Sequence, residues 1–153
     1  MRVAVLGAGA VGARIARQLL SGKSVTQIVL RDTDADRLAQ VSKSLGDRVI
    51  IEHAPFSSQL DAEIIVVATP SGTQMPAVVE AMEQRRPVIS TSDSLAEMVE
   101  LLKFSEQAQK NSTPVILGAG FAPGLTCVLA SHGAAWFDKV QEIHIAKVGT
   151  GGP

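Results

Sequence analysis

The sequence lacks tyrosine altogether and contains four phenylalanines, one tryptophan and one cysteine among its 153 residues. Without tyrosine, no residue of that type in this chain can act as an acid or base in catalysis. A single cysteine excludes an internal disulfide, and the three histidines are scattered without the spacing of metal ligands. We therefore expect neither a disulfide framework nor a metal site.

Strong charge and long apolar runs are also missing. The formal net charge is −1, which argues against a nucleic-acid partner or an anionic membrane surface. No apolar run approaches the ~20 residues that a membrane span requires. The first residues are typical of a strand and a turn rather than a signal peptide. Together with the single cysteine, these features lead us to expect a cytoplasmic protein with no membrane partner.

The most informative segment is the beginning of the chain. Residues 2–6 form a β-type apolar run, residues 7–12 read Gly-Ala-Gly-Ala-Val-Gly, and a helical pattern follows. In such a turn Gly7 permits the sharp change of direction, Gly9 lets a phosphate approach the backbone, and Gly12 lets the helix pack closely on the strand. The helix N-terminus then offers free N–H groups to an anion. The segment predicts a pyrophosphate site for a dinucleotide.

The second apolar run supports this interpretation. It ends at Arg31-Asp32, and Asp32 lies 20 residues after Gly12, where a carboxylate can accept hydrogen bonds from the adenosine ribose. Arg31 points to the other side of a strand, and the neutral Thr33 stands where a basic residue would suit NADP. We therefore expect NAD as the cofactor, with NADP left open.

Strand and helix patterns alternate along most of the chain. We predict strands at residues 2–6, 26–31, 48–52, 63–68, 87–91 and 114–117, and helices at residues 10–20, 35–45, 74–84 and 95–110. This alternation indicates an α/β fold with a doubly wound parallel sheet of the Rossmann type. The length fits one such domain.

The last segment has a different pattern. Residues 125–137 predict a helix, and residues 141–148 alternate isoleucines with polar residues, as in a half-exposed strand. We predict a dinucleotide-binding domain at residues 1–124. Residues 125–153 then form a connecting helix and the start of a second, catalytic-domain sheet. A seventh strand of the first sheet is the alternative.

Ligands of such sheets bind beyond the carboxyl ends of the strands. Residues 68–70, Ala-Thr-Pro, follow the fourth predicted strand, and Thr91 ends the fifth. Cys127 has apolar neighbours, which predict a buried, inert thiol. No catalytic residue can be assigned. The residues that we expect to bind the cofactor are Gly7, Gly9, Ala10, Val11, Gly12, Arg31, Asp32, Thr33, Ala68, Thr69, Pro70 and Thr91.

The chain resembles the nicotinamide-binding domain of saccharopine dehydrogenase-like oxidoreductases. The resemblance lies in the first glycine motif, in Val-Leu-Arg-Asp at residues 29–32, in Val-Val-Ala-Thr-Pro at 66–70 and in Val-Ile-Ser-Thr-Ser at 88–92. Gly-Phe-Ala-Pro-Gly-Leu at 120–125 is the most specific motif, because in that family a Gly-x-x-Pro-Gly-Leu stretch leads into the catalytic domain. The glycine-rich residues 149–153 are similar to a turn of that domain.

The resemblance implies an NAD(P)-dependent enzyme that interconverts an amine and an imine of a small amino-acid-like substrate by hydride transfer. It also implies that this part is inactive alone, and it leaves a homodimer open. Homoserine dehydrogenases and dihydrodipicolinate reductases have similar front domains. A regulatory nucleotide-sensing domain without catalysis is the alternative from another class.

Overall fold

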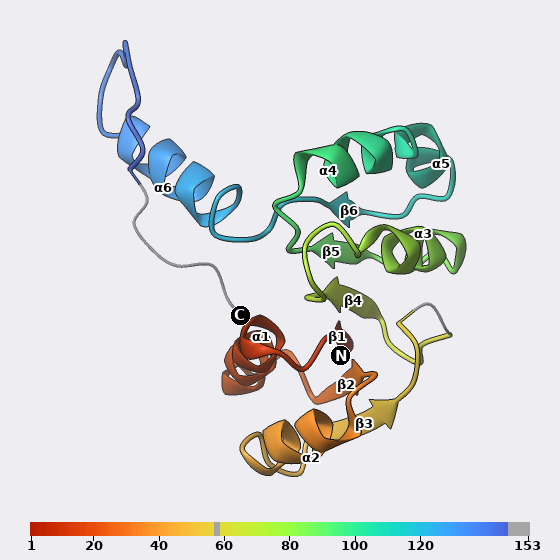
Figure 1. The fold of residues 1–153 in the computed structure, drawn as a ribbon. Helices are drawn as coiled ribbons and strands as arrows, with labels where there is room; N and C mark the ends of the chain where they lie inside the picture. Colours follow the sequence, from red (N-terminus) through yellow and green to blue (C-terminus); the bar gives the residue numbers. More distant parts are fainter. Residues whose placement is uncertain (57–58, 147–153) are drawn as a thin grey trace.

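The computed structural model describes residues 1–56 and 59–146. Its strands are β1 (Arg2–Leu6), β2 (Gln27–Asp32), β3 (Val49–His53), β4 (Ile64–Val67), β5 (Val88–Ser90) and β6 (Val115–Ile116). Its helices are α1 (Ala10–Ser21), α2 (Ala35–Lys43), α3 (Met75–Glu83), α4 (Leu95–Leu102), α5 (Ser105–Lys110) and α6 (Leu125–Ala134). All six strands are parallel and follow the order β3-β2-β1-β4-β5-β6 (Figure 1). The predicted Rossmann-type α/β fold is confirmed.

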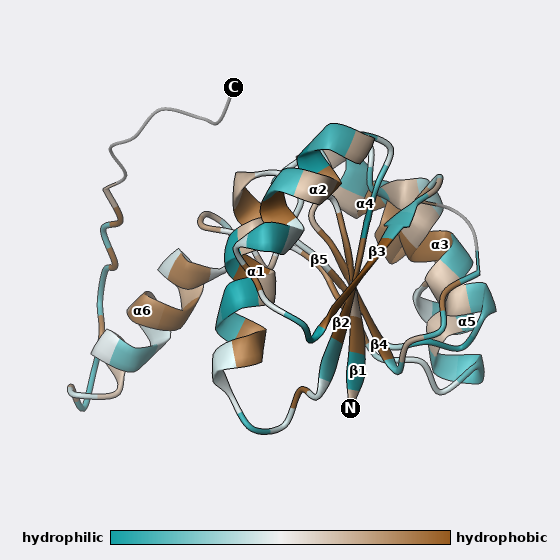
Figure 2. Cartoon of the chain, turned by 90° about the horizontal axis from the view of Figure 1, so that it is seen from below, coloured by the Kyte–Doolittle hydropathy of each residue, from teal (hydrophilic) through white to brown (hydrophobic). Residues whose placement is uncertain are grey.

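Helices cover both faces of the sheet, which is seen nearly edge-on in Figure 2. On one face, Val3 and Val5 of β1 belong to a core cluster with residues of α1 and α2. On the other face, Ala4 and Leu6 belong to a cluster with residues of α3 and α4. Successive side chains of a strand point to opposite faces, so a strand buried on both sides must be apolar throughout. This explains the continuous apolar runs of the sequence.

The direction of winding reverses between β1 and β4. These two strands are hydrogen-bonded neighbours, yet β1 is followed by α1 on one face and β4 by α3 on the other. Leu6, at the end of β1, pairs with Arg31 of β2 and with Val67 of β4. The loops after these three strands therefore lie side by side at a topological switch point, where open α/β sheets bind their ligands.

One predicted helix is in fact two. The predicted helix at residues 95–110 divides into α4 and α5 at Lys103 and Phe104. Phe104 leaves helical geometry, with φ −89° and ψ 7°, and its side chain packs against the core cluster of that face. Burial of this aromatic side chain overrides the helical periodicity.

The predicted strand at residues 141–148 does not form in residues 141–146, which the structure describes as irregular. Ile143 and Ile145 are more than half exposed, and no neighbouring strand pairs with this segment among the described residues. A strand needs a partner for its backbone groups, so alternation alone is insufficient here. The six-stranded sheet does not include this segment as a seventh strand either. Residues 147–153, including the glycine-rich turn, lie outside the described residues, and the domain division at residue 124 stays a prediction.

Candidate functional site

Two of the three glycines after β1 are required by the protein's own backbone. Gly7 has φ +100°, and a Cβ there would lie 2.6 Å from the carbonyl oxygen of Ala68. A Cβ on Gly12 would lie 1.8 Å from the carbonyl oxygen of Gly7. Only glycine fits at either position. The turn is thus locked between β4 on one side and the first turn of α1 on the other.

Gly9 differs from both. Its backbone is extended, at φ −70° and ψ −172°, which any residue adopts. A Cβ built on Gly9 meets no atom within 4 Å among the described residues. Neither the backbone conformation nor the packing of the chain requires glycine here. The open space beside the Gly9 backbone is what a close approach by a phosphate needs.

Gly9 is also the N-cap of α1, and no side chain in the described part of the chain caps this helix. The first turn contains no acidic residue, and Ala10 and Val11 are exposed. By contrast, Asp34 caps α2 and Ser94 caps α4. The N–H groups at the start of α1 and the positive end of its dipole are therefore available to an external anion.

Asp32 lies where the sequence predicts, at the end of β2 beside the glycine turn. Its side chain is 5% exposed. One carboxylate oxygen accepts a hydrogen bond of 2.6 Å from the Ala8 N–H, and the other accepts one of 3.0 Å from the Asp34 N–H. An ionised carboxylate can accept about four hydrogen bonds, so it retains capacity for ribose hydroxyls. The next residue, Thr33, is exposed, and its carbonyl oxygen lies 3.0 Å from Nε2 of His53.

Arg31 lies on the opposite side of β2, as strand geometry predicts. Its guanidinium is buried and donates two hydrogen bonds to Glu52 on β3, at 2.9 and 2.5 Å. It also donates to the carbonyl oxygen of Gln59 at 2.9 Å. These contacts tie β2 to β3 and to the segment after it. These contacts give Arg31 a structural role, and the cofactor contact expected from the sequence stays a prediction.

The loops after β4 and β5 are joined by hydrogen bonds. The Thr91 hydroxyl donates to the Val67 carbonyl at 3.0 Å and accepts from the amide of Gln74 at 3.3 Å. Gln74, which is 1% exposed, also donates to the carbonyl of Thr69 at 2.7 Å. The Thr69 hydroxyl is buried and has no hydrogen-bond partner in the described part of the chain. Such a group is costly unless a ligand or water satisfies it.

Ala68 and Pro70 flank Thr69 in this loop. Ala68 continues β4, with its N–H donating to the Leu6 carbonyl at 2.8 Å, and it packs against Gly7. Pro70 is exposed, and its carbonyl accepts from the hydroxyl of Thr73 at 2.7 Å. Ala68, Thr69 and Pro70 thus form one wall beside the glycine turn.

A cleft of about 480 Å³ opens beside Gly9, between α1 and α2. Two arginines, Arg17 and Arg37, line it together with the glycine turn. Neither arginine is among the residues that the sequence predicts to bind the cofactor, because each fits the polar face of an amphipathic helix. Arg37 forms an ion pair of 3.4 Å with Asp34, and both side chains are about half exposed.

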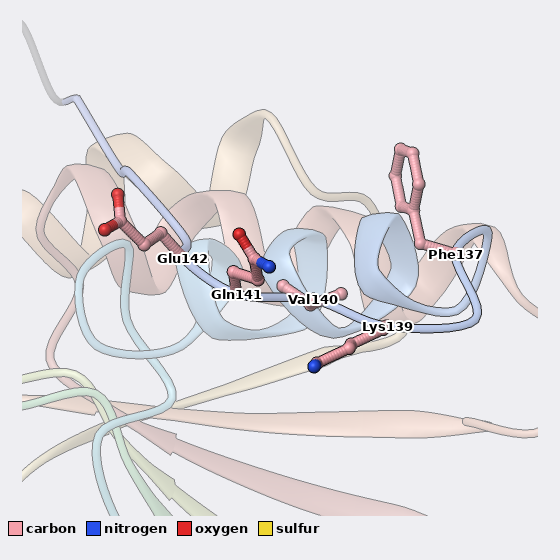
Figure 3. A pocket seen from close by; sticks show the side chains of 5 residues that line it. All are labelled: Phe137, Lys139, Val140, Gln141 and Glu142. Atoms are coloured by element: carbon pink, nitrogen blue, oxygen red, sulfur yellow. The ribbon is translucent and has the colours of Figure 1, made fainter.

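Another hollow, of about 560 Å³, lies at the loop after α6 (Figure 3). One short, exposed segment lines it: Phe137, Lys139, Val140, Gln141 and Glu142. Their side chains point in different directions, so no polar groups converge on it (Figure 3). We do not regard this hollow as a site, despite its volume.

Cys127 is exposed, so the expectation of a buried thiol is wrong. Helix α6 buries none of its residues, which explains the error. Within residues 1–56 and 59–146, no group of side chains could hold a metal ion. No helix in the same residues is long and apolar enough to cross a membrane.

Comparison with known proteins identifies the family. Residues 2–94, more than half of the chain, match the family described as NADP oxidoreductase, coenzyme F420-dependent. The chain belongs to this family, and its fold is the nucleotide-binding Rossmann domain of oxidoreductases. The match ends shortly after β5, so it covers every strand that borders the glycine turn.

Individual relatives are more distant. Inositol 2-dehydrogenase of Mycolicibacterium gilvum is 25% identical over 118 residues, which are 76% of this chain and 34% of that protein. The solved structure of saccharopine dehydrogenase (L-Glu forming) from Saccharomyces cerevisiae has a TM-score of 0.71 at 15% identity, covering 88% of this chain and 31% of that one. Scyllo-inositol dehydrogenase from Lactobacillus casei, solved with NAD(H) and scyllo-inositol, has a TM-score of 0.61 at 16% identity, covering 77% and 36%. The chain spans about a third of the length of these proteins.

Proposed function

We propose that this chain is the dinucleotide-binding domain of an oxidoreductase and that its cofactor is NAD. Gly9 is the observation that supports this best: the space beside its backbone is open at the uncapped start of α1, and no contact among the described residues requires glycine there. The fold positions this N-terminus at the switch point of the sheet. The relatives solved with NAD(H) have the same fold.

In the proposed arrangement the N–H groups at the start of α1 bind the pyrophosphate. Asp32 accepts hydrogen bonds from the adenosine ribose on the β2 side, where Thr33 and the first turn of α2 border the cofactor. The nicotinamide half extends to the β4 side, where the Thr69 hydroxyl gains the hydrogen-bond partner that it lacks. The nicotinamide, when bound, supplies the hydride chemistry, and the protein binds and orients the cofactor.

The substrate side belongs to the whole protein. We infer an amine or imine of an amino-acid-like compound, because the Gly-x-x-Pro-Gly-Leu motif at residues 120–125 resembles the exit of saccharopine dehydrogenase-like enzymes, and one of these has a TM-score of 0.71 with this chain. The second candidate is a cyclic polyol or sugar hydroxyl, which the inositol dehydrogenases among the relatives favour. Testing the full-length protein for NADH formation with both substrate classes separates the two.

The apolar surface of α6 supports a catalytic part beyond this domain. Val128 and Leu129 are each about three-fifths exposed, and Trp136 and Phe137, just after the helix, are exposed by 70% or more. Such a surface is expected to be covered in a larger protein. We therefore expect this domain alone to bind the cofactor without turning over substrate.

Titration calorimetry with NAD, NADH, NADP and NADPH tests the proposal. We expect binding of NAD, and loss of binding in Gly9→Val, because the valine side chain fills the space beside the Gly9 backbone. Gly133→Val is the matched control: a Cβ there also meets nothing within 4 Å, but Gly133 lies in α6, far along the chain from the site. Absence of binding by the parent at about millimolar concentration, or equal binding by parent and a folded Gly9→Val, would overturn the proposal.

A further inference from the structure

The N-terminus of α3 is filled by a carboxylate from another helix. Glu97, on α4, is 7% exposed. One of its oxygens accepts hydrogen bonds from the N–H groups of Gln74 and Met75, at 2.5 and 2.7 Å. The other accepts from the N–H of Gly72, at 3.0 Å. Glu97 therefore satisfies three backbone donors at the start of α3 and faces the positive end of its dipole.

Glu97 does not cap its own helix. Ser94 and Glu97 have the spacing of a capping box, in which the glutamate bonds back to the N-cap of its own helix. Ser94 does accept from the Glu97 N–H, at 3.3 Å. The Glu97 carboxylate, however, bonds only to amides of the segment before α3 and of its first turn, among the described contacts. The carboxylate therefore links α4 to the start of α3 instead of capping α4.

The segment held by Glu97 is the wall of the site after β4. It begins at Thr69, whose hydroxyl is orphaned, and a second set of bonds secures it from β5. Ser92 lies 3.0 Å from the Ser71 hydroxyl, Oγ to Oγ, and accepts from the Gly72 N–H at 3.3 Å. Ser90 donates to the side-chain oxygen of Gln74 at 2.8 Å. A loop so fully bonded is rigid at one edge of the site.

We propose that Glu97 is a positioning residue that fixes the loop of residues 69–74 for the nicotinamide half of the bound dinucleotide. This inference rests on the proposed function. Glu97 does not touch the cofactor; it acts through the backbone of Gly72 and Gln74. It also fills the N-terminus of α3, and Asp34 caps that of α2, so among the described helices that follow β1, β2 and β4 only α1 has an uncapped N-terminus for the pyrophosphate.

The test compares two ligands that share the adenosine half and the pyrophosphate. NAD carries nicotinamide and ADP-ribose does not. For Glu97→Gln we expect NAD affinity to fall about tenfold, because a neutral amide cannot accept three backbone hydrogen bonds. ADP-ribose affinity should stay within about twofold, since the α1 side of the site is independent of Glu97. The emission of bound NADH, which reports the surroundings of the reduced nicotinamide, should shift toward that of free NADH.

Glu100→Gln is the matched control. Glu100 is on the same helix, about half exposed, and pairs with Lys103 at 2.6 Å. The Glu100→Gln substitution should leave the NAD and ADP-ribose affinities and the NADH emission unchanged. If Glu97→Gln fails to fold, Glu97→Asp keeps the charge but draws it back by one methylene, and we expect the same split of affinities at a smaller size.

Equal losses for NAD and ADP-ribose in a folded variant would overturn the positioning role, because they would indicate general loosening. Unchanged affinities and emission would overturn it as well. If the parent chain binds neither ligand, the proposed function fails and the role of Glu97 fails with it. If the parent binds both and Glu97→Gln shows no split, the positioning role alone fails.

Discussion

The N-termini of α1 and α3 stand at the same edge of the sheet, after the neighbouring strands β1 and β4, and they are built in opposite ways. At α1 the N-cap is Gly9, with no side-chain cap, no acidic residue in the first turn and open space beside it. At α3 a buried glutamate from α4 accepts three of the amide hydrogens. A helix N-terminus attracts an anion in either case. The difference is whether the protein supplies that anion itself.

This contrast supports the proposal that one loop binds the cofactor and the other forms a wall of the site. In the proposal, the uncapped N–H groups of α1 bind a phosphate, and their backbone is fixed in advance by Gly7 and Gly12. The amides of α3 are already satisfied, so the loop before it can offer only its orphaned Thr69 hydroxyl and its shape. Four predictions would break or sharpen the comparison.

The largest effect is expected on stability at Gly12. Gly12→Ala places a Cβ 1.8 Å from the Gly7 carbonyl oxygen, which the backbone of the turn cannot accommodate without moving. We expect a loss of at least about 3 kcal/mol in the free energy of unfolding. Gly9→Ala, only three residues earlier in the chain, should lose about 1 kcal/mol or less. Urea denaturation of both variants measures the difference, and similar losses would show that the two glycines do not differ in role.

The second prediction gives α1 the anion that α3 already has. In Gly9→Asp the new carboxylate caps α1, so we expect the free energy of unfolding to rise by about 0.5 kcal/mol. NAD affinity should fall about a hundredfold, because the carboxylate occupies the phosphate position and repels the negatively charged phosphate. Thermal denaturation and calorimetry check the two parts. A variant that is more stable and still binds NAD normally would place the phosphates elsewhere.

The N-terminus of α1 could be predicted from the sequence, whereas the contacts at the N-terminus of α3 could not. The glycine pattern predicted the α1 turn, because the three glycines lie close together in the sequence and Asp32 follows at a fixed spacing. The six strands also follow from local apolar runs. Glu97 could not be found, because its partners lie 22 to 25 residues earlier and its own spacing suggests a local cap. The partners of Arg31 lie on β3 and in the segment after it, and the break at Phe104 depends on packing against the core. Both are set by tertiary contacts, which the local sequence does not reveal.

The third prediction concerns Asp32, which holds the α1 turn and, in the proposal, the ribose. Asp32→Ala removes the acceptor of the Ala8 and Asp34 N–H groups, so we expect the free energy of unfolding to fall by about 1–2 kcal/mol. NAD affinity should fall about tenfold or more, and NADP should gain relative to NAD once the negative charge is gone. Arg31 takes no part in this gain, since Glu52 holds it.

Asp32→Asn separates the two roles. It keeps the size of the side chain and one oxygen acceptor, so stability should recover in part while the NAD preference is still lost. Dissociation constants for NAD and NADP, with urea denaturation alongside, give both readouts. A NAD-to-NADP ratio that is unchanged in both variants would mean that Asp32 serves only the backbone of the turn.

The smallest effect is expected at Arg37, one of the two arginines that line the cleft beside Gly9. Its exposed ion pair with Asp34 contributes little to folding, so Arg37→Ala should change the free energy of unfolding by about 0.5 kcal/mol or less. If NADP enters the site at all, its 2′-phosphate lies on the α2 side of Asp32, within reach of this guanidinium. NADP affinity should then fall about threefold while NAD affinity stays the same. Arg14→Ala, an exposed arginine of α1 that does not line the cleft, should change neither affinity. Equal losses of NAD and NADP in Arg37→Ala would instead indicate that Arg37 contacts the pyrophosphate. The open N-terminus of α1 would then bind its anion with the help of an arginine side chain, which the N-terminus of α3 does not need for the carboxylate that it already holds.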